Sequence, residues 1–149
     1  MIYIASRYRE RETNRAIERE LRAGGFDTFL PEHLGIEAYG PNEKRSVAIV
    51  CEQAIRDCST MVVVAPYGHD VSFEIGYGVA HAEAVGMTRP IVLFDPFGRR
   101  TVDNDDMIAP HVDCVVSSTK ELVQKLKWLE NLGGETSMKE DAGSRNGDL

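Results

Sequence analysis

Five short apolar runs recur along the first 116 residues of the chain. They span residues 2–5, 26–30, 61–65, 90–94 and 112–116. Each run is short and rich in β-branched or aromatic residues, which is typical of a buried strand. Apolar residues recur with helical spacing over residues 14–23, 47–58 and 73–85, and again from residue 122 onward. Strands that alternate with helices indicate βαβ units, so the pattern predicts an α/β fold with a five-stranded parallel sheet covered on both faces.

Two long loops, at residues 31–45 and 95–111, each follow the end of an expected strand. Loops of this length inside a compact domain usually carry function. A capping box (STKE, residues 118–121) precedes the last helix. Residues 1–132 are expected to form a single α/β domain. Residues 133–149 are small and polar without periodicity, and are predicted to form a disordered C-terminal tail.

The composition is that of an ordinary globular domain, with 149 residues, 42% hydrophobic residues and a formal net charge of −7. This acidic balance offers no basic field to a nucleic acid polymer. Cys51, Cys58 and Cys114 form no CxxC pair, which predicts a reducing cytoplasmic environment without a disulfide framework or a zinc site. The N-terminal residues enter a strand at once and no apolar run approaches ~20 residues, so we expect neither a signal peptide nor a membrane span.

The chain also lacks the common cofactor motifs. No group of His, Cys and Asp residues has the spacing of metal ligands. Neither the GxGxxG dinucleotide motif nor the GxxxxGKS/T phosphate loop occurs. We therefore expect no metal and no cofactor.

Glu74 is the main candidate for chemistry, because it follows the strand expected at residues 61–65 and lies in the first turn of the helix expected from Phe73. Ligands of open α/β sheets bind at the carboxyl ends of the strands. An acid beside Phe73 and Ile75 suits a nucleophile or a general acid or base. A glutamate that only complements the helix dipole is the alternative.

Asp70 precedes Glu74 by about one helical turn. The two carboxylates are therefore expected to face one pocket, where each would shift the pKa of the other. The alternative is that Asp70 is an ordinary residue at the start of a helix.

Ser6, Arg7 and Arg9 connect the first strand to the first helix. Arginines at a helix N-terminus favour a phosphate site. Glu10 and Glu12 lie among them, so a solvated start of a helix with mixed charges is the alternative. His33 follows the second strand, where it either contacts the base of a ligand or lies on the surface of a loop.

Four segments in order resemble the nucleoside 2-deoxyribosyltransferase superfamily, including its nucleotide N-glycosidase branch. They are residues 2–5 (IYIA), 55–65 (IRDCSTMVVVA), 73–77 (FEIGY) and 107–109 (MIA). The FEIGY segment after a VVVA strand is the most specific of these matches, and the resemblance spans roughly residues 1–130.

The resemblance implies a flavodoxin-like or Rossmann-like fold and a homodimer or higher homo-oligomer with shared active sites. It makes Glu74 the nucleophile that attacks C1′ of a nucleoside, with Tyr3 in support of the catalytic acid. Asp70 would protonate the departing base. The loop that holds Asn104 and Met107 would reach into the site of a neighbouring subunit.

Three positions depart from the transferase pattern. Gly68, Cys51 and Ser59 stand where the transferases carry aspartates. In the nucleotide-hydrolysing branch, however, the position of Gly68 holds a small residue near the 5′-phosphate. Residues 31–33 (PEH) also resemble that branch, where a histidine such as His33 lies near the base.

Three functions are therefore compatible with the sequence. The first is an N-glycosidase that acts on a nucleoside 5′-monophosphate, which Ser6, Arg7, Arg9 and Gly68 favour. The second is a nucleoside 2-deoxyribosyltransferase, which passes the sugar to a second base. The third is a nucleotide-binding module without catalysis, which the missing aspartates suggest. In each case the partner is a small nucleotide or nucleoside.

Overall fold

A computed structural model describes residues 1–35, 40–98 and 107–141, with side chains up to residue 131. The strands are β1 (Ile2–Ala5), β2 (Thr28–Phe29), β3 (Thr60–Val64), β4 (Ile91–Phe94) and β5 (Cys114–Val116). The long helices are α1 (Arg11–Ala23), α2 (Pro41–Asp57), α3 (His69–Val85) and α4 (Thr119–Asp141). Three short 3₁₀ helices are η1 (Tyr8–Glu10), η2 (Pro31–Leu34) and η5 (Ala109–His111).

The strands form one parallel sheet with the order β2-β1-β3-β4-β5. The chain steps from β1 to one neighbour, β2, and then returns to the other side of β1 with β3. This reversal of direction makes the carboxyl ends of β1 and β3 the switch point of the sheet, where open α/β folds bind ligands.

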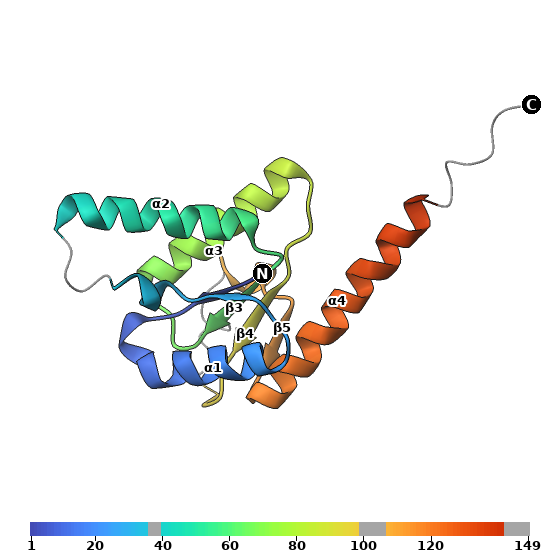
Figure 1. Ribbon diagram of the computed structural model, residues 1–149, viewed down its shortest axis with the longest axis horizontal. Coiled ribbons are helices and arrows are strands. Elements are labelled where there is room, and N and C mark those ends of the chain that lie inside the picture. The colour runs from blue at the N-terminus through green and yellow to red at the C-terminus, as the bar shows by residue number, and fades with distance from the viewer. Residues whose placement is uncertain (36–39, 99–106, 142–149) are drawn as a thin grey trace, which may run out of the picture.

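Helices cover both faces of the sheet, as Figure 1 shows, with α1 and α4 on one face and α2 and α3 on the other. Alternate residues of β1 point to opposite layers. Ile2 and Ile4 pack in the cluster with α1 and α4, whereas Tyr3 packs in the cluster with α2 and α3. The five-stranded parallel α/β architecture expected from the sequence is confirmed.

Close packing fixes α3 against the sheet. A Cβ added at Gly78 would lie 2.6 Å from Sδ of Met61 on β3, so a larger residue there would require the Met61 side chain to move. The buried Arg89 then ties α3 to α2, because its guanidinium donates to the carbonyl oxygens of Gly78, Cys58 and Arg56 at 2.8–3.1 Å. The helix that carries Glu74 is therefore held in place over the site.

Three helices begin earlier than the sequence predicted, among them α1, which starts at Arg11 instead of residue 14. The expected loop at 31–45 is wrong in part, because it contains η2 and the start of α2, which begins at Pro41. Proline suits the first position of a helix, but the first turns of α2 are exposed and lack an apolar face that would reveal them. Helix α3 begins at His69, so Glu74 lies in its second turn rather than its first.

Other boundaries shift by a few residues. Strand β2 is shorter than predicted, although the flanking Phe26 and Leu30 are still buried. Helix α4 continues to Asp141, beyond the boundary expected at residue 132, and it projects from the body of the molecule (Figure 1). The last part of the expected tail, 142–149, lies outside the described residues.

Within the described residues, no helix combines the length and apolar character needed to cross a membrane.

Candidate active site

Tyr3 and Glu74 form a hydrogen-bonded pair between the sheet and α3. The Tyr3 hydroxyl donates to Oε1 of Glu74 at 2.7 Å. Tyr3 is fully buried on β1, and its ring stacks on Phe29 of β2 with centroids 5.5 Å apart. The sheet therefore fixes the tyrosine, and the tyrosine orients the carboxyl group.

The second oxygen of Glu74 is the unusual atom of the pair. Oε2 is buried and has no hydrogen-bond partner among the described residues. Burial raises the pKa of Glu74 to about 7, while the hydrogen bond from Tyr3 lowers it and the charge of Asp70 raises it. Burial, followed by the charge of Glu74, also raises the pKa of Tyr3, so its hydroxyl keeps its proton and remains a donor. The pair presents an acceptor that changes charge near neutral pH.

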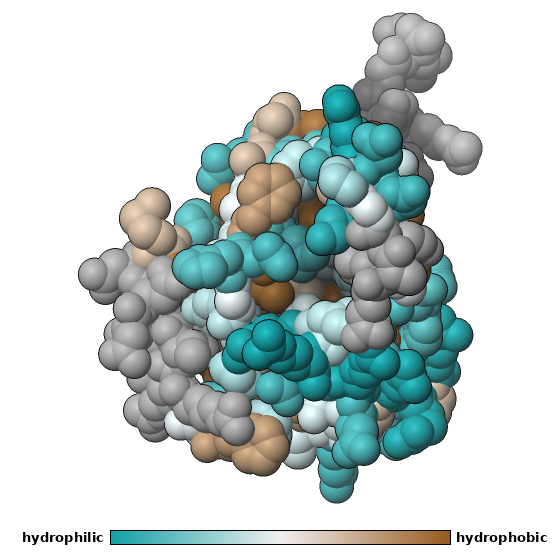
Figure 2. Space-filling view, turned by 90° about the vertical axis from the view of Figure 1, so that its left-hand side faces the viewer, coloured by the Kyte–Doolittle hydropathy of each residue, from teal (hydrophilic) through white to brown (hydrophobic). Residues whose placement is uncertain are grey.

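A pocket of about 500 Å³ opens at Glu74, at the carboxyl ends of β1, β2 and β3. It is lined by Ser6, Arg7, Tyr8, Arg9, Asn14, Pro31, Glu32, Gly68, His69, Asp70, Val71 and Glu74. Figure 2 looks onto this side of the molecule and shows hydrophilic residues around a central hollow with apolar surface at its floor. The volume is in the range of small-molecule sites.

One part of the pocket suits an anion. Arg7 and Arg9 are exposed, and within the described residues neither forms an ion pair, so Glu10 and Glu12 do not neutralise them. Gly68 is the N-cap of α3 and supplies no side-chain cap, which leaves the first amides of that helix to other acceptors. The Cβ of a larger residue at Gly68 would lie 3.9 Å from Nε of Arg7, so the arginine lies close to this helix terminus.

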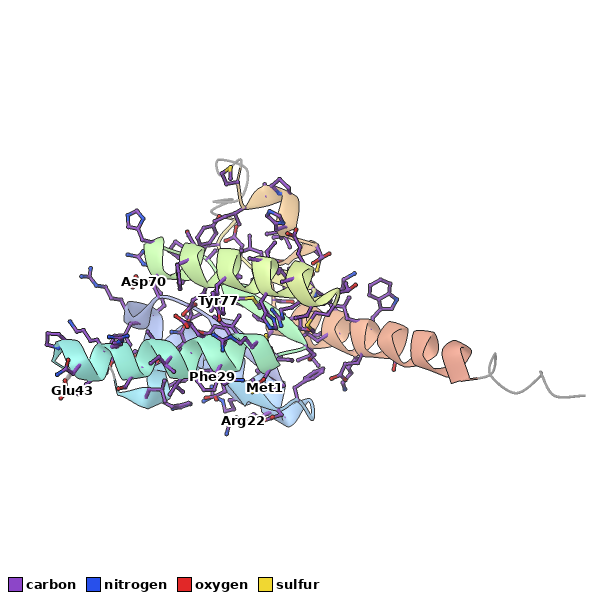
Figure 3. All side chains as sticks on the ribbon, turned by 90° about the horizontal axis from the view of Figure 1, so that it is seen from above. Met1, Arg22, Phe29, Glu43, Asp70 and Tyr77 are labelled. Carbon is purple, nitrogen blue, oxygen red and sulfur yellow. The ribbon has the colours of Figure 1, made fainter. Side chains whose placement is uncertain are left out.

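Asp70 lies at the start of α3, at the mouth of the same pocket (Figure 3). It is exposed, whereas Glu74 one turn later is half-buried and its Oε2 atom is buried. The structure therefore places the two carboxylates in one pocket, with different surroundings.

Cys51 lies close to this pair, in one of the positions where the sequence departs from the transferase pattern. Burial raises the pKa of its thiol to about 11, while its interaction with the Tyr3 hydroxyl lowers it. The thiol is therefore neutral at physiological pH, and no second carboxylate stands at this position.

Other predicted residues lie apart from the pocket. Nε2 of His33 is 2.6 Å from Oε2 of Glu18, and the lining at this point comes from Pro31 and Glu32 instead. Met107 is 80% exposed and borders a second hollow of about 430 Å³ on the outer side of α3. Within one chain it does not line the pocket of Glu74. Asn104 lies outside the described residues.

Asn14 and Glu32 are not predicted by the residue pattern, although both are buried and both line the pocket. Polar residues in a first helical turn and in a loop are usually solvated, so residue type alone gave no signal. Within the described residues, no group of three or more His, Cys, Asp and Glu side chains is arranged to hold a metal ion.

The sequence of the chain matches no family model and no curated protein. Its structure resembles a 2-deoxyribosyltransferase from the psychrotolerant bacterium Bacillus psychrosaccharolyticus, with a TM-score of 0.68 and 18% identity over 82% of this chain and 89% of that chain. The chain shares the fold of that transferase. A CMP N-glycosidase of Clostridium botulinum is also similar, with a TM-score of 0.51 and 14% identity over 85% of this chain and 97% of that chain. At these identities the likeness establishes the fold.

The raised pKa of Glu74 predicts a pH-dependent effect of Glu74→Gln on stability. Unfolded Glu74 loses its proton near pH 4.5, but folded Glu74 keeps it to about pH 7. Between these pH values the unfolded protein releases a proton that the folded protein keeps. The free energy of unfolding of the wild type therefore falls as the pH rises, by at most about 3 kcal/mol in total. The amide does not titrate, so the variant should gain free energy of unfolding over the wild type between pH 5 and pH 8, as measured by urea denaturation.

Tyr3→Phe provides the matched control for this prediction. It removes a hydrogen bond that lowers the pKa of Glu74, so this pKa should be higher in the variant than in the wild type. The free energy of unfolding of Tyr3→Phe should therefore continue to fall to a higher pH than that of the wild type. A stability difference between Glu74→Gln and wild type that is the same at pH 5 and pH 8 contradicts the assigned pKa.

Proposed function

We propose that the protein hydrolyses the N-glycosidic bond of a nucleoside 5′-monophosphate, with ribose or 2′-deoxyribose, and releases the free base. The observation that carries the proposal is the buried Oε2 of Glu74, which has no hydrogen bond among the described residues, while Tyr3 holds Oε1. A carboxylate in this state, in a pocket that also contains Arg7 and Arg9, suits attack on the sugar of a phosphorylated ligand.

In the first step, Oε2 of ionised Glu74 attacks C1′ and forms an ester bond. The bond from C1′ to the base nitrogen breaks, and its electron pair leaves with the base. Asp70, at the mouth of the pocket, donates a proton to that base, a role worth ~10²–10⁴-fold in rate. The products of this step are the free base and a glycosyl ester of Glu74.

In the second step, water attacks C1′ and breaks the ester bond. Asp70, now ionised, accepts the proton of the water, and Glu74 leaves as a carboxylate. This is the double displacement of retaining glycosidases, applied to an N-glycosidic bond. The Tyr3 hydroxyl supports both steps, because it stabilises the charge on Glu74 in the attacking and leaving forms.

The phosphate preference rests on one end of the pocket. Ser6, Arg7 and Arg9 come from the segment after β1, and Gly68, the N-cap of α3, lies close to Arg7. A 5′-phosphate bound there meets two cationic side chains and a helix N-terminus without a side-chain cap. A free nucleoside would leave both arginines without a ligand.

Base exchange by a nucleoside 2-deoxyribosyltransferase is the second candidate. It is favoured by the fold comparison, where the TM-score is 0.68 for the transferase and 0.51 for the N-glycosidase. The first step is the same, but a second base replaces water in the next step. A nucleotide-binding module without turnover remains the third hypothesis, since Gly68 and Cys51 replace carboxylates.

We also propose a homodimer or higher homo-oligomer with shared sites. The support is the exposed Met107, which borders a hollow formed by α3 and η5, together with the exposed Phe73 on α3. A partner that covers this surface would bury both side chains. The free cysteines suit a reducing compartment, and we place the protein in the cytoplasm.

The nucleophile is tested by Glu74→Gln, which keeps the shape of the side chain but removes the carboxylate. We expect free-base release from nucleoside monophosphates to fall by at least a thousandfold, with the far-UV circular dichroism spectrum unchanged. Glu130→Gln, on the exposed side of α4, is the control and should keep full turnover. Activity of Glu74→Gln within tenfold of the wild type contradicts the covalent mechanism.

The phosphate site is tested by Arg7→Ala and Arg9→Ala. Hydrogen bonds to charged groups contribute about 1.5–3 kcal/mol, so each variant should lose roughly tenfold or more in kcat/KM for a monophosphate. The matched free nucleoside should be affected little, because it has no phosphate to lose. Equal losses on both substrates mean a structural role for the arginines, and a wild type that prefers the nucleoside favours the transferase.

Assembly is tested by Met107→Asp. A charge on this exposed apolar site should weaken the oligomer and lower turnover, as measured by sedimentation velocity and base release at micromolar concentration. Trp128→Asp is the control, because Trp128 is 51% exposed on α4, in the opposite layer. A fully active monomeric wild type is the result that rules out shared sites.

A further inference from the structure

Asn14 has a buried acceptor atom that no described residue satisfies. The side chain is fully buried in α1, yet it borders the pocket of Glu74. Its Nδ2 donates to the carbonyl oxygen of Arg7 at 3.1 Å and lies 3.5 Å from Oε2 of Glu32. Both neighbours are acceptors, so they fix the orientation of the amide, and Oδ1 must point away from them without a partner.

Glu32 adds a second acceptor to the same wall of the pocket. Its Oε1 accepts from Nε of Arg15 at 2.7 Å. Among the described residues its Oε2 has only the long hydrogen bond from Asn14, although a carboxylate oxygen can accept two hydrogen bonds. Glu32 is 8% exposed, so water has little access to this oxygen. A buried acceptor without a donor destabilises a fold, which calls for a reason to keep Oδ1 of Asn14 beside the under-used Oε2 of Glu32.

We infer that Asn14 and Glu32 form a specificity site that binds a hydrogen-bond donor group of the nucleotide. The inference rests on the proposed function. The donor is an exocyclic amino group of the base, as in cytosine and adenine, or a hydroxyl group of the sugar. A base with a carbonyl oxygen at that position would place acceptor against acceptor and would be rejected.

The wall that carries this site is held firmly. Glu32 belongs to η2, and His33 in the same turn is paired with Glu18 of α1 at 2.6 Å. Glu18 also binds Thr28 and Arg22. His33 therefore acts as a positioning residue that anchors η2, and Glu32 is the residue that faces the ligand.

The test measures binding to protein that carries Glu74→Gln, so that turnover does not interfere. Two pairs of ligands differ in an amino group against an oxo group on the base: cytidine and uridine 5′-monophosphate, and adenosine and inosine 5′-monophosphate. The fifth ligand, 2′-deoxycytidine 5′-monophosphate, lacks the 2′-hydroxyl group of cytidine 5′-monophosphate. Titration calorimetry gives Kd for each ligand, before and after the additional substitution Glu32→Gln. This change exchanges an acceptor for a donor at nearly constant shape.

We expect Glu32→Gln to reduce one of two ratios of Kd, amino against oxo base or ribose against 2′-deoxyribose, by tenfold or more, since hydrogen bonds to charged groups are strong. A smaller preference for amino over oxo bases identifies the base as the donor. A smaller preference for ribose over 2′-deoxyribose identifies the sugar hydroxyl. Glu130→Gln, on the exposed side of α4, is the control, because Glu130 contacts neither the pocket nor η2, and it should change neither ratio.

Asn14→Ser provides a second test in case Glu32→Gln does not fold, because it removes Oδ1 and should reduce the same ratio. If the monophosphates bind and neither variant changes the ratios of Kd, this inference is overturned and the proposed function stands. Failure of all five ligands to bind contradicts the proposed function and the inference together.

Discussion

The hydrogen bond between Tyr3 and Glu74 is the interaction on which the site depends. A carboxyl group as buried as Glu74 loses most of its hydration, and only one of its oxygens has a partner among the described residues. Burial raises the pKa of Glu74 to about 7, and the hydrogen bond from Tyr3 opposes this rise by stabilising the carboxylate. Because Tyr3 is itself fixed within the sheet, it holds the carboxyl group of Glu74 in one orientation at the wall of the pocket.

The order of the strands brings the remaining groups to that oxygen. Since β1 lies between β2 and β3, the segments after all three strands meet at one edge of the sheet. The segment after β1 supplies Arg7 and Arg9, the turn after β2 supplies Glu32, and the start of α3 follows β3. Cationic groups and buried acceptors thus lie on different elements around Glu74, which matches a ligand with a phosphate at one end and hydrogen-bond donors elsewhere.

Much of this arrangement is visible in the sequence, because apolar runs reveal buried strands and the segment around Glu74 has a specific pattern. The strands, the main helices and the pocket position of Asp70 and Gly68 follow from such signals. The start of α2 does not, since its first turns are solvated and lack an apolar face. Asn14 and Glu32 could not be predicted for a related reason, because their burial comes from contacts between α1 and η2 that no local pattern encodes. The same contacts turn His33 toward Glu18.

The central claim is that Glu74 forms a covalent bond with the sugar. It is tested most directly by mixing the protein with a 2-fluoro-substituted nucleoside monophosphate, which slows hydrolysis of the ester, followed by mass spectrometry of the intact and digested protein. The account predicts a mass increase of one sugar phosphate, located on the peptide that contains Glu74 and missing in Glu74→Gln. Release of the base without any adduct, or with an adduct on another residue, would contradict it.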